Sequence, residues 1–206
     1  MGKIFYIMGK SATGKDTIYK ELSCRFRDRL NKIVSYTTRP IREGETQGVE
    51  YFFVTEDEAL LLENEGKIIE LREYQTVMGP WKYFTVNDDP IDLEKNDYLV
   101  IGTLESYLSM RSYFSEETVV PVYIEVEDSN RLLRALNREK KQAAPNFSEV
   151  CRRYLADEQD FSEEKLKLAG IRHRFYNNRD LEAVVSEIAS YIVSCLDGTE
   201  GGTLYG

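Results

Sequence analysis

The most informative segment of the sequence runs Lys3-Ile-Phe-Tyr-Ile-Met-Gly-Lys-Ser-Ala-Thr-Gly-Lys-Asp-Thr17. An apolar run of strand length comes first, and a polar turn between Gly9 and Gly14 leads into an amphipathic helical pattern. The two glycines permit backbone angles that a side chain would forbid, so several N–H groups can point toward one anion, and Lys15 adds a full positive charge. The segment therefore predicts a cradle for the phosphates of a nucleoside triphosphate, formed by Gly9, Lys10, Ser11, Ala12, Thr13, Gly14, Lys15, Asp16 and Thr17.

One position of this cradle departs from the usual pattern G-x-x-x-x-G-K-[ST]. Asp16 stands where Ser or Thr is expected, and the hydroxyl comes one residue later, at Thr17. Two interpretations stay open for Asp16. Its carboxylate orders the water ligands of a Mg2+ ion, with Thr17 nearby, or it only stabilises the first turn of the helix.

The charge balance and the cysteines disfavour several classes of protein. With 36 acidic and 27 basic residues, the chain is unlike a dedicated binder of nucleic acid or of anionic membranes. Cys24, Cys151 and Cys195 are too widely spaced for a disulfide framework or a metal site, which favours a reducing compartment. No apolar run approaches membrane-spanning length. We therefore expect a cytoplasmic protein with small-molecule partners, and its assembly as a monomer or a homodimer stays open.

Alternating strand and helix patterns predict an α/β fold, with a parallel sheet of the P-loop type and helices on both faces. Strand patterns are found at 33–36, 49–54, 67–74, 81–86, 98–101, 119–126 and 172–176. Helical patterns are found at 17–30, 55–64, 104–113, from 128 onward, at 147–164 and at 181–196. Residues 37–86 interrupt the alternation and predict a small mixed α/β lobe, whose last two strands are joined through Met78-Gly79-Pro80.

A second anion site is predicted in the loop after residue 36. Arg39 and Arg42 lie three residues apart on either side of Pro40, which stiffens the turn. Both guanidinium groups can converge on one phosphate, and Tyr51 offers a hydroxyl to the same place. Two ordinary surface arginines would give the same pattern, but the nearby phosphate cradle favours a binding role.

The residues around this loop carry a family resemblance. Val34-Ser-Tyr-Thr-Thr-Arg-Pro-Ile-Arg-Glu-Gly-Glu-Thr-Gln-Gly-Val-Glu-Tyr-Phe-Phe-Val54 closely resembles the guanylate kinase signature S-x-T-T-R-x-x-R-x-G-E-x-x-G-x-D-Y-x-F, and a weaker resemblance continues to about Leu196. The resemblance implies a core (1–36 and 97–196), a monophosphate-binding lobe (37–86), a helical lid (about 137–160) and a flexible tail (197–206). It also implies the transfer of a phosphoryl group from ATP to GMP or dGMP, with Mg2+.

The same resemblance implies roles for individual residues. For the acceptor phosphate it implies Arg39, Arg42, Tyr51 and Tyr83. For guanine it implies Ser35, Glu70, Thr85 and Thr103, although Glu70 taken alone reads as an exposed strand residue. For the transferring phosphoryl group it implies Lys15, Arg39 and the lid arginines Arg134, Arg138 and Arg153. Asn178 matches a turn of the family near the adenine of ATP.

The sequence also departs from the family pattern. The family strand I-L-D-I-D-x-Q-G carries two aspartates, and here Ile101 and Thr103 replace them, while Phe84 replaces the glycine of Y-Y-G. Guanine recognition and Mg2+ binding should both weaken as a result. A kinase of the same fold that acts on ribose 1,5-bisphosphate and a non-catalytic interaction module are the alternatives. Glu70 argues against the first, and Lys15 argues against the second.

Overall fold

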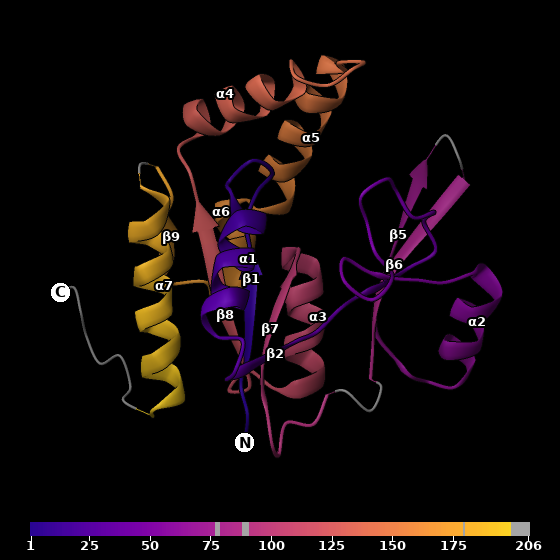
Figure 1. Cartoon of the computed structure of the whole chain (residues 1–206), viewed down its shortest axis with the longest axis vertical. Helices are drawn as coiled ribbons and strands as arrows, with labels where there is room; N and C mark the ends of the chain where they lie inside the picture. The colour runs from indigo at the N-terminus through magenta and orange to yellow at the C-terminus, as the bar shows by residue number, and fades with distance from the viewer. Residues whose placement is uncertain (77–78, 88–90, 179, 199–206) are drawn as a thin grey trace.

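The core of the protein is a parallel β-sheet. The structure, a computed structural model, describes residues 1–76, 79–87, 91–178 and 180–198 (Figure 1). The sheet has the order β2-β7-β1-β8-β9, and all of its pairings are parallel. This confirms the predicted fold class. Its strands are β1 (Ile4–Met8), β2 (Leu30–Lys32), β7 (Asp97–Gly102), β8 (Val119–Glu125) and β9 (Arg174–Tyr176).

Helices cover both faces of this sheet because the side chains of β1 alternate between them. Phe5 and Ile7 pack against α1 (Lys15–Arg25) and α7 (Leu181–Leu196) on one face. Ile4, Tyr6 and Met8 pack on the other face, against α3 (Leu104–Phe114) and α6 (Glu163–Leu168). All five residues of β1 are buried, and each aliphatic side chain among them contributes about 1.5–3 kcal/mol. The strand that leads into the predicted cradle is therefore rigidly held.

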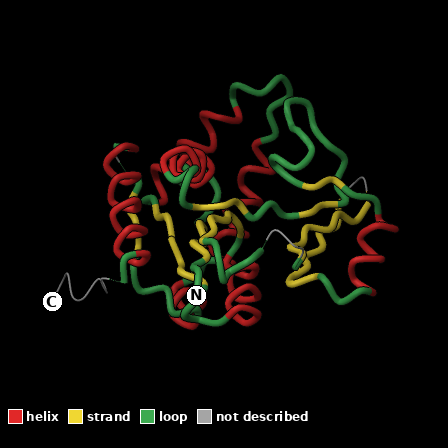
Figure 2. Tube along the Cα trace, turned by 60° about the horizontal axis from the view of Figure 1, so that its bottom comes forward, coloured by secondary structure: helices red, strands yellow, loops and turns green. Residues whose placement is uncertain are grey.

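A second, smaller sheet forms the predicted lobe. Its order is β4-β3-β6-β5, and it lies to one side of the core in Figure 2. The helix of the lobe packs on this sheet over a small core of Ala59, Phe84 and Val86. The elements of the lobe are β3 (Tyr36–Thr37), β4 (Phe52–Phe53), α2 (Glu56–Asn64), β5 (Ile68–Thr76) and β6 (Gly79–Val86).

The ends of α2 follow from local sequence chemistry. The Thr55 hydroxyl accepts a hydrogen bond from the Glu58 N–H, and the Glu58 carboxylate accepts one from the Thr55 N–H at 2.7 Å. This capping box satisfies two N–H groups that would otherwise lack a partner. Gly66, at φ +67°, follows the helix with a left-handed backbone that favours glycine. The predicted helix at 55–64 is confirmed at both ends.

Two helices lie above the carboxyl edge of the core sheet, where the lid is expected (Figure 1). They are α4 (Asp128–Glu139) and α5 (Phe147–Asp160). The single helix predicted at 147–164 is wrong, since the chain leaves α5 at Phe161 and begins α6 two residues later. The break is built by Ser162, whose hydroxyl accepts a hydrogen bond from the Lys165 N–H and caps the new helix.

Two further predictions need correction near the first crossover. The helix predicted at 17–30 spans only 15–25, and Leu30 belongs to β2. Leu30 is buried in β2, and a helix would bury it as well, so apolar spacing alone could not distinguish the strand from the helix. The strand predicted at 33–36 is the crossing between the two sheets, because Ile33 donates its N–H to Leu99 of the core while Tyr36 pairs with Phe84 of the lobe.

The lobe strands also differ from the prediction in length. The strand predicted at 49–54 is reduced to Phe52–Phe53, since the chain turns at Gly48, which has φ +76°. Gly79 and Pro80 belong to β6 and pair with β5 instead of forming the connection. Met78 lies outside the described residues, as does the predicted tail from residue 199 onward.

Candidate active site

The loop between β1 and α1 forms a compact turn of the kind that binds phosphate. Gly14 lies in the left-handed region at φ +86°, and Ala12 does so at φ +64° despite its side chain. A Cβ atom at Gly9 would lie 2.5 Å from the Ile124 carbonyl oxygen, so only glycine fits there. Buried Thr13 donates its hydroxyl to the Lys10 carbonyl at 2.9 Å, which fixes the turn. The predicted strand–loop–helix arrangement is present.

Asn177 stabilises the cradle through a side-chain hydrogen bond, and sequence reasoning missed this residue. Its side-chain amide is buried and donates to the Thr13 carbonyl at 2.8 Å, close to Gly14. The neighbour that the sequence suggested, Asn178, instead accepts the Glu127 N–H at 2.9 Å. A role for Asn178 near adenine stays a prediction. The available signal was that Asn177 directly follows a core strand, at the sheet edge where the strand ends meet.

The charged residues of the cradle differ in their environment. The Lys15 side chain is largely buried, and its Nζ lies 3.7 Å from the Asp16 carboxylate. Asp16 is 77% exposed, and Thr17 is exposed as well. Among the described residues, the cradle therefore presents a cation whose one ion-pair partner is a solvated carboxylate 3.7 Å away.

Arg39 is buried at the base of the second anion site. Its Nη1 and Nη2 donate to both oxygens of Glu45, at 2.8 and 2.7 Å. Its guanidinium carbon lies 5.4 Å from the ring centre of Tyr51 and 5.3 Å from that of Phe53. Its Nε is buried without a hydrogen-bond partner among the described residues. Glu45 occupies the fork of Arg39 in this state, whereas Arg42 is exposed, and the convergence of both guanidinium groups on one phosphate stays a prediction.

A row of three tyrosines, Tyr51, Tyr83 and Tyr74, extends from this site across the lobe. The ring centres of Tyr51 and Tyr83 are 5.6 Å apart, and those of Tyr83 and Tyr74 are 5.7 Å apart. Burial raises the pKa of Tyr51, and the charge of Asp16 adds to the rise.

The Arg39–Glu45 pair makes the stability of the lobe depend on pH. The hydrogen bond from Arg39 is the largest cause that lowers the pKa of Glu45 from 4.5 to about 2. Because the folded pKa lies below the unfolded one, the stabilisation is complete above pH 4.5 and is lost as the pH falls toward 2. We expect Glu45→Gln to flatten the decrease in unfolding free energy between roughly pH 5 and pH 3, measured by urea unfolding. The matched control is exposed Glu21→Gln, and equal slopes for both variants would contradict this role.

A buried polar network occupies the position implied for the base. The Glu70 side chain is 1% exposed, so its reading as an exposed strand residue is wrong. Arg72 donates to both Glu70 oxygens, through Nε at 2.9 Å and Nη2 at 3.2 Å. Thr85 donates to Glu70 at 2.9 Å, and its hydroxyl lies 3.5 Å from that of Ser35. Arg72 Nη1 reaches Thr103 at 3.4 Å, which connects the lobe to the core.

Sequence reasoning missed Arg72, although a signal was available. Arg72 and Glu70 are two residues apart on β5, so their side chains share one face of the strand. The same network contains Thr103, which replaces a family aspartate. Arg72 beside Glu70 and the missing carboxylate at 103 therefore act in one place, and both make the pocket less negative.

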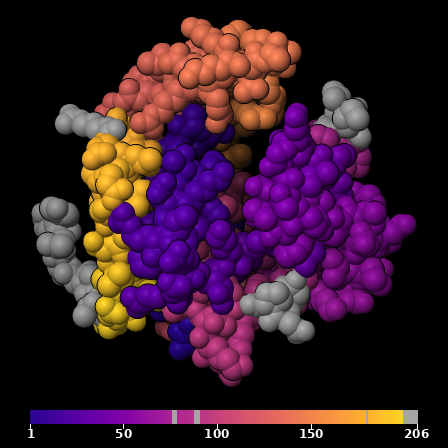
Figure 3. Space-filling view, in the orientation of Figure 1, coloured from indigo at the N-terminus to yellow at the C-terminus, as the bar shows by residue number. Residues whose placement is uncertain are grey.

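A cleft of about 720 Å³ separates the core, the lobe and the lid (Figure 3). The cradle contributes Lys15 to its wall, the lobe contributes Tyr74 and the edge of the core sheet contributes Thr103. The tyrosine row and the Arg72 network both end at this cleft, through Tyr74 and Thr103 respectively. The cradle thus borders this space directly, whereas Tyr51 and Tyr83 of the second predicted anion site lead to it through Tyr74. The remaining walls are formed by Gly9, Ser11, Gly102, Leu104, Glu105, Leu108, Ser109, Asp157, Asp160, Phe161, Lys165, Leu168 and Ala169.

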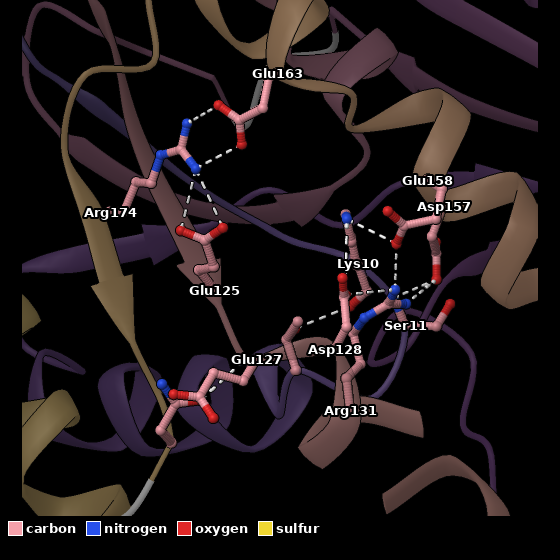
Figure 4. Close-up of polar contacts among 12 residues, drawn as sticks. Lys10, Ser11, Glu125, Glu127, Asp128, Arg131, Asp157, Glu158, Glu163 and Arg174 are labelled. Atoms are coloured by element: carbon pink, nitrogen blue, oxygen red, sulfur yellow. Dashed lines mark hydrogen bonds and ion pairs between the residues drawn. The ribbon is translucent and has the colours of Figure 1, made fainter. Parts of the chain in front are cut away.

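Carboxylates of α5 contact the cradle directly (Figure 4). Asp157 accepts the Ser11 N–H at 2.8 Å, and Glu158 pairs with Lys10 at 2.7 Å. Arg131, which sequence reasoning also missed, is buried and pairs with both of these carboxylates. The Arg131 guanidinium carbon lies 4.1 Å from the ring centre of Tyr154, which ties α4 to α5. In this state the acidic side chains of Asp157 and Glu158 on α5 therefore cover the cradle.

The three predicted lid arginines do not reach the cleft in this arrangement. Arg134 donates to the Asn177 carbonyl at 2.9 Å. Arg138 and Arg153 are exposed and line a separate hollow of about 400 Å³ between α4 and α5, where Arg153 pairs with Glu149 at 2.8 Å. Their role at the transferring phosphoryl group stays a prediction that requires the lid to move.

One named relative matches most of this chain, and others match parts of it. A family model described as guanylate kinase matches residues 1–100. The guanylate kinase of Malacoplasma penetrans is 31% identical over 186 residues, which cover 87% of this chain and 83% of that relative. The chain belongs to the guanylate kinase family. Guanylate kinases of Streptococcus agalactiae and Thermobifida fusca are 40% and 43% identical over shorter stretches, each about 35% of this chain and about a third of the relative.

A solved member of the guanylate kinase family has the same fold. The crystal structure of guanylate kinase from Anaplasma phagocytophilum superposes with a TM-score of 0.60 at 22% identity, and the match covers 98% of this chain and 88% of that chain. This match supports the α/β architecture from the cradle to α7. Among the described residues, no helix is both long enough and apolar enough to cross a membrane.

Proposed function

We propose that this member of the guanylate kinase family transfers the terminal phosphoryl group of ATP to GMP or dGMP, giving ADP and GDP or dGDP. The observation that carries the proposal is the cleft that the phosphate cradle shares with Tyr74, the end of a tyrosine row that leads through Tyr83 and Tyr51 to Arg39. Family membership gives the nucleotides their identity. We further propose the division into core, monophosphate-binding lobe and lid, and a cytoplasmic location, where Cys24, Cys151 and Cys195 would stay unpaired as they are here.

Phosphoryl transfer requires alignment and charge neutralisation more than a general base. The amides of the cradle and Lys15 hold the phosphates of ATP at the positive end of α1. Asn177 keeps those amides in place by bonding the Thr13 carbonyl. ATP must displace the Asp157 carboxylate from the Ser11 N–H, since a phosphate oxygen requires the same donor. Binding of ATP therefore frees the lid to rearrange.

The acceptor is held on the opposite side of the cleft. Arg42 is exposed and can reach a phosphate, and the phenols of Tyr51 and Tyr83 supply O–H donors beside it. The unpaired Nε of Arg39 adds a donor that is already desolvated. Closure of the lid would bring Arg134, Arg138 and Arg153 toward the charge that develops on the transferring group, and it would exclude water.

The cradle offers a limited donor set for Mg2+. The described residues bring no three His, Cys, Asp or Glu side chains together in a metal site, and Ile101 supplies no oxygen. A single exposed carboxylate at Asp16, with Thr17 beside it, nevertheless fits Mg2+ because this ion takes most of its ligands from phosphates and water in such sites. When bound, Mg2+ would neutralise charge on the ATP phosphates. Asp16 would hold its waters.

The Asp16 assignment predicts a specific change in Mg2+ dependence. Asp16→Asn should raise the Mg2+ concentration needed for half-maximal ATP binding, measured by titration calorimetry, and for half-maximal turnover. The fold should be unaffected because the side chain is 77% exposed. If both Mg2+ dependences stay unchanged, Asp16 only stabilises the first turn of α1.

The substrate assignment is tested by ADP formation in the presence of different acceptors. We expect GMP and dGMP to support much faster ADP release than AMP, CMP, UMP or ribose 1,5-bisphosphate. Faster release with ribose 1,5-bisphosphate than with GMP would overturn the assignment. No ADP release with any acceptor would favour a non-catalytic module. None of the relatives named above is described as a ribose 1,5-bisphosphate kinase or as a non-catalytic module.

A further inference from the structure

The acceptor-base pocket contains a cation that the proposed function does not use. Arg72 lies within it, with a side chain only 12% exposed, and its pKa is raised because the gain from pairing with Glu70 outweighs the cost of burial. We propose that Arg72 is a specificity-determining residue that makes the pocket read the 6-oxo group and N1–H of a purine but not its 2-amino group. This inference rests on the proposed phosphorylation of GMP.

The argument begins with the acceptor capacity of Glu70. An ionised carboxylate offers about four lone-pair positions. Arg72 uses two of them, at 2.9 and 3.2 Å, and the Thr85 hydroxyl uses a third at 2.9 Å. One position remains for the base. Hypoxanthine presents one donor on this edge, its N1–H, whereas guanine presents two adjacent donors, N1–H and the 2-amino group.

Thr103 cannot accept the second donor without losing a bond. A hydroxyl has two acceptor lone pairs. The Ser106 N–H uses one at 3.2 Å, and Arg72 Nη1 approaches the other at 3.4 Å. In this arrangement the 2-amino group of guanine finds no unoccupied acceptor on either residue. It must therefore compete with the guanidinium of Arg72.

The 6-oxo group, in contrast, meets suitable donors. Because the Thr85 hydroxyl gives its proton to Glu70, Ser35 is the donor in the 3.5 Å contact between the two hydroxyls, and it can turn that proton to a base oxygen instead. A guanidinium carries five N–H donors, and those of Arg72 that do not point at Glu70 or Thr103 add to the positive potential there. A 6-oxopurine is therefore retained with or without its 2-amino group.

The proposal predicts the ratio of kcat/KM for GMP to kcat/KM for IMP. We expect this ratio to be below about tenfold in the native protein, and to rise by about tenfold or more in Arg72→Met, which frees two acceptor positions on Glu70. Arg72→Lys keeps a charge beside buried Glu70 but binds it at only one point, so its ratio should lie between the two. Glu73→Gln, exposed on the same strand but on its opposite face, should leave the ratio unchanged.

The ratio separates a recognition role from a structural one, because a loss of folding or of alignment lowers both rates together. If Arg72→Met does not fold, the Arg72→Lys ratio and the native ratio carry the test. A native ratio above about a hundredfold, or ratios that do not differ among the Arg72 variants, would overturn the inference while leaving GMP phosphorylation intact. Absence of ADP release with both GMP and IMP would instead contradict the proposed function.

Discussion

The Lys15→Ala variant is expected to fold like the native protein and to lose about three orders of magnitude in kcat/KM for ATP. Lys15 has one ion-pair contact, at 3.7 Å, with a carboxylate that is 77% exposed, so its removal costs little stability. The same side chain lines the cleft beside the cradle amides. Without it, the charge that develops between the two nucleotides is neutralised by backbone dipoles alone.

ADP release and thermal unfolding, measured side by side, check this expectation. The matched control is Lys20→Ala, since Lys20 is an exposed lysine of the same helix. It should leave both measurements unchanged. If Lys15→Ala keeps turnover within about tenfold of the native protein, the cradle does not hold the reacting phosphates.

The second large effect is expected at the other end of the cleft, in Arg42→Ala. We expect the KM for GMP to rise by about 30-fold to 100-fold, because a charge-assisted hydrogen bond to phosphate is worth about 2–3 kcal/mol. The KM for ATP should change little. Stability should be preserved because the side chain is exposed, and the bond from the Arg42 N–H to Glu45 is made by the backbone.

Initial rates over a range of GMP concentrations measure this effect. Arg27→Ala provides the control, as its side chain is 79% exposed and pairs only with neighbouring Asp28 among the described residues. An unchanged KM for GMP would remove Arg42 from the acceptor site and leave the tyrosines and Arg39 to hold the phosphate.

The features that sequence reasoning predicted are those built by neighbouring residues. The cradle needs two glycines and a lysine within a few residues of a buried strand, and the capping box of α2 needs only Thr55 and Glu58. Both are encoded locally, and the cradle and the helix at 55–64 were both predicted. The central sheet followed from the alternation of apolar runs with helical patterns.

The missed residues act through contacts that are remote in sequence. Asn177 bonds Thr13, and Arg131 pairs with Asp157, and neither partner is visible from local spacing. Arg72 was overlooked because its role depends also on Thr103, which caps α3 and accepts a hydrogen bond from it. The predicted end of the first helix at Leu30 was wrong because a buried leucine is compatible with a helix and with a strand equally well.

The opposition of the two anion sites is tested most directly with one ligand that spans both. Guanosine and adenosine joined through an oligophosphate chain would place phosphates on the cradle and on the acceptor site together. The account predicts that this molecule binds the native protein far more tightly than ATP or GMP alone, and that Lys15→Ala and Arg42→Ala each weaken it. Binding no tighter than that of ATP alone, with no effect of Arg42→Ala, would contradict it.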